Sequence, residues 1–207
     1  MISQSTRAHD APGHAALRAM FAARKQVFID LLKWDLPALD GRFELDHFDN
    51  EDARYLILLG PDGDHRASAR LLPTSGPHLL GDLYPWLCAG VPTSGPSVWE
   101  ISRFCLDPAC DRDQRRDARN QLVTALAEYA LRHGITDYIG VAGKGWFDKI
   151  RRFGWDCSAL GEARQDAGCE ILALHIRING DTLAGLERTG IYAPLALHLE
   201  ESGETMQ

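Results

Sequence analysis

The sequence predicts an α/β (α+β) fold in which a single mixed sheet is flanked by helices. Segments rich in strand-forming residues alternate with segments of helical periodicity, and turn-forming residues separate them. The 207 residues are 45% hydrophobic and 25% charged, which suits one sizeable core. We therefore expect one domain over residues 1–207, with its informative elements between about 17 and 190 and flexible tails at both ends.

The first predicted element is a helix from Ala15 to Leu32, followed by a loop that begins near Trp34. Helical periodicity places five residues on one stripe: Leu17, Met20, Phe21, Arg24 and Phe28. Arg24 is the exception in this stripe, and it has two interpretations. Either its apolar stem is buried at the rim of the core with the charge in water, or its guanidinium is turned towards a pocket.

An acidic run over residues 40–52 follows the first helix. Such a run is usually a solvated loop. Here Asp46 and Asp49 flank a His-Phe pair and the run leads directly into a strand. We therefore expect at least these two carboxylates near the entrance to the sheet.

A hairpin is predicted next, with strands at residues 55–59 and 67–72 around a Gly-Pro-Asp-Gly-Asp turn. Arg70 stands in the middle of the second strand, which is an unusual place for an unpaired cation. The following connection, residues 73–96, is long and rich in Gly and Pro. Loops of this length in a compact domain are often functional.

The segment over residues 98–104, Val-Trp-Glu-Ile-Ser-Arg-Phe, predicts a buried strand between Gly-Pro and Asp-Pro pairs. Alternation places Glu100 and Ser102 on one face, with Trp99, Ile101 and Arg103 on the other. A carboxylate beside a hydroxyl in a central strand is costly unless both have partners. The alternative is an edge strand with a solvated polar face.

The second half of the chain continues the alternation of helices and strands. A helix is expected from Asp113 to His133, with Gly134 as the residue that ends it. A strand, a short helix, a strand and a last short helix are expected at residues 137–142, 146–153, 170–178 and 181–190. Four basic residues cluster around the first of these short helices: Lys144, Lys149, Arg151 and Arg152.

Composition excludes several classes of function. The net charge of −7 argues against general nucleic-acid binding. We expect no membrane span, because no apolar run approaches 18 residues, and no secretory signal. Five cysteines without a Cys-x-x-Cys pair indicate reduced thiols of a cytoplasmic protein and argue against a zinc or other metal site.

Several short patterns occur together along the chain. They are Arg24, Phe28 and Trp34; Asp46-x-x-Asp49; Ser-Ala-Arg-Leu-Leu-Pro-Thr at 68–74; Trp-Glu-Ile-Ser-Arg-Phe at 99–104; Gly-Val at 140–141; and Arg-Arg-Phe-Gly-Trp at 151–155. In this order and spacing they resemble the acyl-homoserine-lactone synthases, the LuxI-type autoinducer synthases, from about residue 17 to 190. The fold of that family is similar to GNAT-type acetyltransferases, which agrees with the predicted element order.

The resemblance implies a two-substrate reaction without a cofactor. S-adenosylmethionine gives its α-amine to an acyl thioester, carried on acyl carrier protein or coenzyme A. The homoserine part then closes to a lactone, and methylthioadenosine leaves. A pocket for S-adenosylmethionine needs carboxylates that face its cations and a cation that faces its carboxylate.

The same resemblance suggests a role for each unusual residue. The expected S-adenosylmethionine pocket consists of Arg24, Phe28, Trp34, Asp46, Asp49, Arg70 and Phe104. The arginines bind the substrate carboxylate or anchor the acids, and the aromatic rings of Phe28 and Trp34 enclose the adenosine or the sulfonium. The expected catalytic group is Glu100, Ser102 and Arg103. Glu100 is the candidate base for the ammonium, directly or through a water, and backbone N–H groups at 102–104 are candidate donors to the thioester oxyanion.

The acyl chain and its carrier are expected to meet the second half of the chain. Members that make 3-oxo products have Thr or Ser after the Gly-Val pair, whereas this chain has Ala142. We therefore expect an unsubstituted, 3-hydroxy, branched or aromatic acyl group, in a pocket formed by Leu122, Ala142 and Trp146; the alternative is that these residues are ordinary core. The expected docking site for the carrier is the set Lys144, Lys149, Arg151 and Arg152. The alternatives are a solvated helix face and, with coenzyme A, a site for the nucleotide phosphates.

Two rival functions remain. The first is an acyl-coenzyme A dependent N-acyltransferase of the same fold that acts on another amine. Such an enzyme would bind the pyrophosphate of coenzyme A with a Gly-rich turn between a strand and a helix. Residues 107–119 contain no glycine, which argues against it. A non-catalytic ligand-binding protein would not need Arg24, Asp46, Asp49, Arg70 and Glu100 together.

Overall fold

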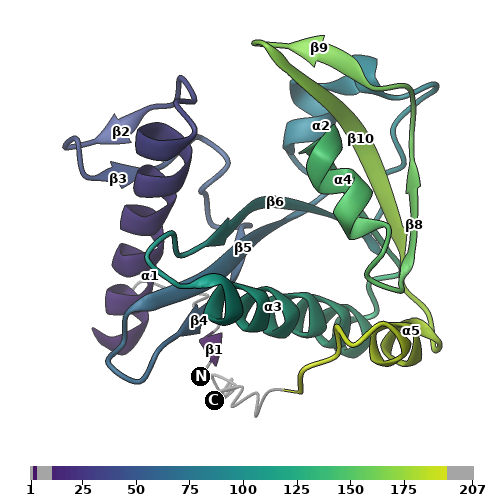
Figure 1. Cartoon of the computed structure of the whole chain (residues 1–207). Helices are drawn as coiled ribbons and strands as arrows, with labels where there is room; N and C mark the ends of the chain where they lie inside the picture. Colours follow the sequence, from purple (N-terminus) through teal and green to yellow (C-terminus); the bar gives the residue numbers. More distant parts are fainter. Residues whose placement is uncertain (1, 4–10, 195–207) are drawn as a thin grey trace, which may run out of the picture.

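The computed structural model describes residues 2–3 and 11–194, so most of both expected tails lies outside the described residues (Figure 1). One eight-stranded sheet has the order β1-β4-β5-β6-β7-β10-β8, with β9 also paired to β10. A separate two-stranded sheet joins β2 and β3. None of the helices in the described part is long and apolar enough to cross a membrane.

The strands are β1 Ile2–Ser3, β2 Ala38–Leu39, β3 Phe43–Glu44, β4 Arg54–Leu59, β5 His65–Pro73, β6 Val98–Leu106, β7 Asp137–Gly143, β8 Asp156–Ala159, β9 Arg164–Asp166 and β10 Cys169–Arg177. The helices are α1 Ala11–Arg24, the π-helical η1 Lys25–Leu31, α2 Leu79–Asp82, the 3₁₀-helical η2 Pro85–Leu87, α3 Arg112–His133, α4 Lys144–Ile150 and α5 Thr182–Arg188. All the expected strands and helices are present. The expectation of one continuous first helix was wrong in detail, because its last two turns are π-helical.

The sheet is mixed, as expected. The β4–β5 hairpin and its neighbours pair antiparallel, whereas β6 and β7 pair in parallel. The five unexpected strands, β1, β2, β3, β8 and β9, contain only two to four residues each. Such segments are too short for alternation of apolar and polar residues to be recognised.

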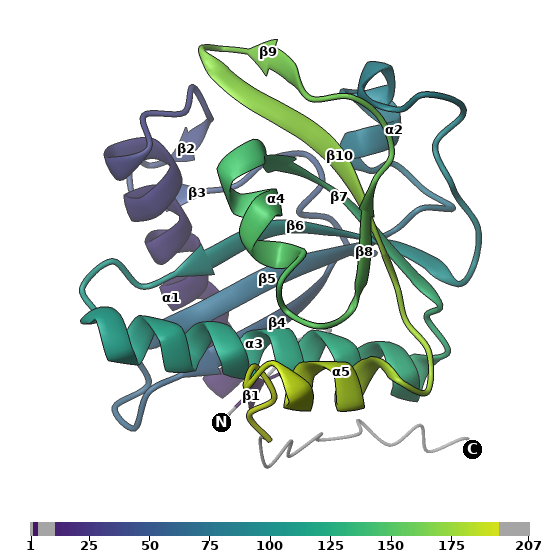
Figure 2. The same ribbon diagram turned by 45° about the vertical axis from the view of Figure 1, so that its right-hand side comes forward.

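Helices cover both faces of the sheet (Figure 2). Alternate residues of β4 point to opposite sides, as a strand requires. Leu56 and Leu58 belong to the core under α3, whereas Tyr55 and Ile57 pack with Met20 of α1. A third cluster places α2 and η2 on the same face as α1, against β7 and β10. The charged residues discussed below lie on this α1–α2 face.

The longest helix, α3, has the boundaries that its sequence predicts. Asp111 accepts hydrogen bonds from the backbone of Asp113 and Gln114, and the Gln114 side chain accepts one from the Asp111 N–H. This is a complete capping box. At the other end, Gly134 adopts φ +68°, which a residue without a Cβ reaches at little cost. The helix therefore spans the sheet as a rigid support.

The parallel strands β6 and β7 separate part of the way along their length. Their pairing covers only Val98–Glu100 with Asp137–Ile139, although both strands continue beyond it. At the point of separation, a Cβ on Gly140 would lie 2.7 Å from the carbonyl oxygen of Ile101. The sheet thus opens immediately after Glu100.

Candidate active site

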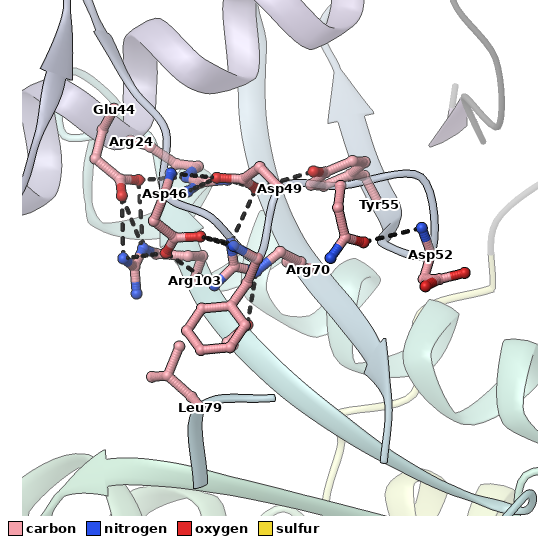
Figure 3. Close-up of polar contacts among 12 residues, drawn as sticks. Arg24, Glu44, Asp46, Asp49, Asp52, Tyr55, Arg70, Leu79 and Arg103 are labelled. Carbon is pink, nitrogen blue, oxygen red and sulfur yellow. Dashed lines mark hydrogen bonds and ion pairs between the residues drawn. The ribbon is translucent and has the colours of Figure 1, made fainter. Parts of the chain in front are cut away.

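Six charged side chains from α1, β3, the loop after β3, β5 and β6 form one network on the α1–α2 face (Figure 3). We call the following residues the charged network: Arg24, Glu44, Asp46, Asp49, Arg70 and Arg103. The three cations balance the three carboxylates. Each side chain is at most 10% exposed, so hydrogen bonds must replace the lost water.

Arg24 points into the molecule, so the interpretation of a charge at the rim of the core was wrong. Its Nε lies 2.5 Å from Oε2 of Glu44, and its two Nη atoms contact the Asp49 oxygens at 2.8 and 2.9 Å. Burial alone would lower the pKa of Arg24, but the hydrogen bonds and charges of Asp49 and Glu44 outweigh it and raise that pKa. In turn, these arginine contacts hold the pKa of Asp49 below its ordinary value despite burial.

Arg70 joins the loop after β3 to the centre of the sheet. Its Nη1 and Nη2 contact the Asp46 oxygens at 2.5 and 3.1 Å, and Nη1 also lies 3.0 Å from Oδ1 of Asp49. Its Nε donates to the hydroxyl of Ser102 at 3.0 Å. The cation that looked misplaced in the strand therefore has acceptors for all its nitrogen atoms.

Arg103 lies on the same face as Ser102, so the expectation that it would lie on the opposite face was wrong. The strand register passes from Arg70–Ser102 to Ser68–Cys105, which marks a β-bulge between them, and Arg103 has φ +52°. A bulge redirects a side chain. The Nη2 of Arg103 consequently reaches Asp46 at 2.7 Å and Glu44 at 3.0 Å.

Two aromatic rings stand next to the charged network. Phe28 and Trp34 stack with their centroids 4.9 Å apart and an interplanar angle of 20°. We call them the aromatic pair. The guanidinium carbon of Arg103 lies 5.7 Å from the Phe28 centroid. Trp34 is 45% exposed, so one face of the pair is open to a ligand.

Glu100 is fully buried, and β6 lies between β5 and β7, so the alternative of an edge strand was wrong. The N–H groups of Leu79 and Leu80, at the start of α2, donate to its two oxygens at 3.2 and 2.6 Å. Burial raises the pKa of Glu100, although these N–H groups and nearby positive charges oppose the shift. A carboxylate with a raised pKa is suited to accepting a proton.

Glu44 and Tyr55 are site residues that the sequence reasoning missed. Glu44 is buried and accepts from Arg24 and Arg103. The hydroxyl of Tyr55 donates to Oδ1 of Asp49 at 2.9 Å. The only signal for Glu44 was its position two residues before Asp46 in the acidic run, and Tyr55 is indistinguishable from other strand aromatics.

The structure groups Phe104 with the residues expected to hold the acyl chain, not with the charged network. Its ring centroid lies 5.3 Å from that of Trp146, and both rings pack on the core under α3 and α4. Leu122 and Ala142 belong to the same core and are buried. The expectation that Phe104 belongs to the S-adenosylmethionine pocket is therefore corrected, because the bulge places its ring on the opposite face of the sheet from the charged network.

The four basic residues of α4 and its C-terminal turn, Lys144, Lys149, Arg151 and Arg152, are here called the basic patch. Lys144 forms an ion pair with Asp148, with its Nζ 2.8 Å from Oδ2. Lys149, Arg151 and Arg152 are exposed. Exposed charges of one sign on a short segment can attract an anionic partner.

Within residues 11–194, no group of three or more His, Cys, Asp or Glu side chains could hold a metal ion. All five cysteines, which lie in this range, are free thiols. The chemistry available at the site is therefore that of arginines, carboxylates, aromatic rings and backbone N–H groups.

Comparison with known proteins gives consistent matches. A family model described as autoinducer synthase matches residues 9–184. The acyl-homoserine-lactone synthase of Ralstonia nicotianae is 36% identical over 168 residues, which cover 79% of this chain and 82% of the relative.

Solved structures agree with this match. A CoA-dependent acyl-homoserine lactone synthase, BjaI, with SAM and isopentyl-CoA, has a TM-score of 0.81 and 28% identity over 92% of this chain and 89% of that chain. A second CoA-dependent acyl-homoserine lactone synthase, MesI, has a TM-score of 0.82 and 26% identity, and the match covers 94% of this chain and 97% of that chain. An acyl-CoA N-acyltransferase from Pseudomonas aeruginosa, at 16% identity and a TM-score of 0.54 over 84% and 98%, shares the fold alone.

Proposed function

The chain belongs to the autoinducer synthase family and is an acyl-homoserine-lactone synthase, and we propose that the charged network and the aromatic pair form its pocket for S-adenosylmethionine. The enzyme transfers an acyl group from an acyl thioester to the amine of S-adenosylmethionine. Lactone closure releases methylthioadenosine. The product is a quorum-sensing signal, and the fold is that of GNAT-type acyltransferases.

One observation carries the assignment of the pocket: contacts run without a break from Trp34 through Phe28 and Arg103 to Asp46. The open ring of Trp34 suits the sulfonium or the adenosine. Asp46 is the network carboxylate with the greatest exposure, at 10%, so it is available to the substrate ammonium. The buried carboxylates, Glu44 and Asp49, hold the arginines in place.

We assign Glu100 as the group that takes the proton from the ammonium, because an ammonium has no lone pair for attack on a thioester. Glu100 and Ser102 lie two residues apart on the face that carries the charged network. Because Glu100 is buried, the proton reaches it through an intervening group or a water. Its raised pKa makes it a stronger base than an ordinary carboxylate.

The thioester is proposed to approach from the opposite face of the sheet, where β6 and β7 separate. Phe104, Trp146, Leu122 and Ala142 belong to the core on this face and would contact the acyl chain. The bulge leaves one residue of the pair at positions 103 and 104 unpaired with β5, which frees an N–H group to bind the oxyanion. Ala142 offers no hydroxyl to a 3-oxo group.

We propose acyl-coenzyme A as the first donor to test, because two structurally similar synthases are described as CoA-dependent. The basic patch then binds the nucleotide phosphates. With acyl carrier protein as donor, the same patch would receive its acidic surface. The five free thiols are consistent with a reducing compartment, and we propose that the enzyme acts in the cytoplasm.

The experiment is incubation of the purified protein with S-adenosylmethionine and a panel of coenzyme A and carrier-bound thioesters. Methylthioadenosine release is followed by chromatography, and the lactone is identified by mass spectrometry. We expect equal amounts of both products. Acyl transfer without methylthioadenosine would instead indicate an N-acyltransferase that acts on another amine.

A further inference from the structure

His78 is a buried histidine with one unpaired ring nitrogen, and it lies beside the residues that hold Glu100. It is 7% exposed, and its Nδ1 lies 2.9 Å from the carbonyl oxygen of Gly76. A carbonyl only accepts, so Nδ1 carries the proton of the neutral ring. Nε2 is then the basic nitrogen, and it is buried without a hydrogen-bond partner among the described residues.

The same short segment fixes both His78 and Glu100. His78 immediately precedes Leu79 and Leu80, whose N–H groups bind the Glu100 oxygens. The imidazole folds over α2 at Gly81, where a Cβ would lie 2.6 Å from both Nε2 and Cε1. Glycine at this position therefore makes room for the ring.

The charges around His78 connect it to Glu100. Positive charge on His78 lowers the pKa of Glu100, and Arg70, from β5, acts in the same direction. Asp82 in α2 is another charged residue of this segment. Its backbone N–H donates to the carbonyl oxygen of His78, one turn away.

We propose that His78 is a positioning residue for Glu100: its ring, bonded to the Gly76 carbonyl and packed over Gly81, fixes the segment whose N–H groups bind the carboxylate. This inference rests on the function proposed above. The ammonium loses one proton to Glu100, and the nitrogen lone pair then attacks the carbonyl carbon of the thioester. As the thioester C–S bond breaks, the nitrogen loses a second proton. One of the two protons goes to the departing thiolate, and the other passes to solvent.

The test is His78→Asn. The amide nitrogen of asparagine can still donate to the Gly76 carbonyl, but the ring packed over Gly81 is lost. We expect kcat for methylthioadenosine release to fall by about 100-fold, the lower end of general acid–base effects, because Glu100 is no longer held in place. The KM for S-adenosylmethionine should stay constant, and the pH–rate profile should shift because the N–H groups that bind Glu100 are displaced.

A matched control is His65→Asn. His65 is an equally buried histidine, but it bonds Ser68 and not the segment that holds Glu100. We expect the His65→Asn enzyme to have the kcat and the pH–rate profile of the wild type. A folded His78→Asn enzyme with wild-type kcat and pH profile would overturn the inference while leaving the proposed function intact.

Gly81→Ala decides the question if His78→Asn lowers the melting temperature. It displaces the ring by steric overlap and removes neither titratable group. We expect a reduced kcat at constant KM, and a wild-type kcat would overturn the inference. If the wild-type protein releases no methylthioadenosine with any thioester, the proposed function fails together with this inference.

Discussion

Arg70 joins the two parts of the site at the level of a single side chain. Its guanidinium binds Asp46 and Asp49 from the loop after β3, and its Nε binds Ser102 on β6. A guanidinium can serve these acceptors at once because its donors form a fixed planar fork, which an ammonium lacks. The loop that carries the carboxylates is thereby held against the strand that carries Glu100.

Glu100→Gln tests the proposed base. The substituted amide keeps one oxygen for the N–H groups of Leu79 and Leu80 and cannot take a proton. We expect kcat to fall by about 10²- to 10⁴-fold, the usual range for general acid–base catalysis. Affinity for S-adenosylmethionine, measured by calorimetry, should be retained. A folded variant with near-full activity would move the base to another group, with Asp46 first.

The ionised carboxylate of Asp49 makes the stability of the fold depend on pH under acidic conditions. Its folded-state pKa lies below the unfolded value near 4, so it stabilises the fold above that value, and this contribution disappears as pH falls towards the folded pKa. Asp49→Asn should lower the free energy of unfolding at pH 7 by about 3–5 kcal/mol, as for a broken buried ion pair.

Urea unfolding of both proteins between pH 6 and 3 checks this account of Asp49. The difference between wild type and Asp49→Asn should narrow as pH falls below about 4, because the unfolded wild-type chain binds a proton at Asp49 there while the folded carboxylate stays ionised. A difference that is independent of pH would mean that Asp49 acts through packing and not through its charge.

At the level of elements, β6 places both proposed substrates. Its bulge turns Arg103 towards the charged network and Phe104 towards Trp146. Its early separation from β7 opens the sheet beside Glu100. We propose that the two substrates meet here from opposite faces of the sheet.

Gly140→Ala tests the importance of this geometry. The new Cβ would lie 2.7 Å from the Ile101 carbonyl oxygen, so β7 must shift relative to β6. We expect loss of activity and a loss of about 1–3 kcal/mol in unfolding free energy, as for overpacked cores.

Gly145→Ala in α4 is the control for Gly140→Ala. Its Cβ meets open space, and alanine favours helix, so unfolding free energy should rise by about 0.5–1 kcal/mol. Equal behaviour of the two variants would contradict the account.

At the level of the whole molecule, the two proposed substrate sites lie on opposite faces of the sheet. The charged network and Glu100 are on the face that α1 and α2 cover. The residues proposed for the acyl chain belong to the core that the sheet forms with α3 and α4. Figures 1 and 2 show these helices on the two faces. Because one sheet connects both faces, we propose that the chain is a single domain, and we expect one cooperative unfolding transition.

Charge reversal in the basic patch tests whether this patch binds the acyl donor. The double variant Lys149→Glu, Arg152→Glu changes two exposed residues. We expect a raised KM for the natural thioester and an unchanged KM for S-adenosylmethionine. Added salt should weaken the effect, because exposed charges are screened beyond about 8–10 Å. An unchanged KM for both coenzyme A and carrier-bound thioesters would exclude the patch as a donor site.

Much of the fold and part of the site could be predicted from the sequence. Arg24 and Arg70 could be recognised because each interrupts an apolar pattern, which is costly without partners. Glu44 could not be recognised, because it lies in an acidic run that resembles a solvated loop. The predicted direction of the Arg103 side chain was wrong, because alternation of residues along a strand cannot reveal a bulge. The pairing of each arginine with its carboxylates depends on contacts over 20–59 residues of chain, which local pattern does not encode.

The central claim is that the charged network and the aromatic pair bind S-adenosylmethionine, and calorimetric titration of Trp34→Ala tests it most directly. Trp86→Ala is the matched control, because Trp86 is an exposed tryptophan that contacts Tyr84 and the Leu83 carbonyl instead of Phe28. We predict that Trp34→Ala weakens binding of S-adenosylmethionine by about tenfold or more, since an aromatic contact with a desolvated cation is worth about 2 kcal/mol. Methylthioadenosine has no sulfonium, so its affinity should fall less, through the lost contact with the adenosine ring. The melting temperature should be unchanged, and Trp86→Ala should bind as the wild type does. Wild-type affinity of Trp34→Ala for both ligands would contradict the account.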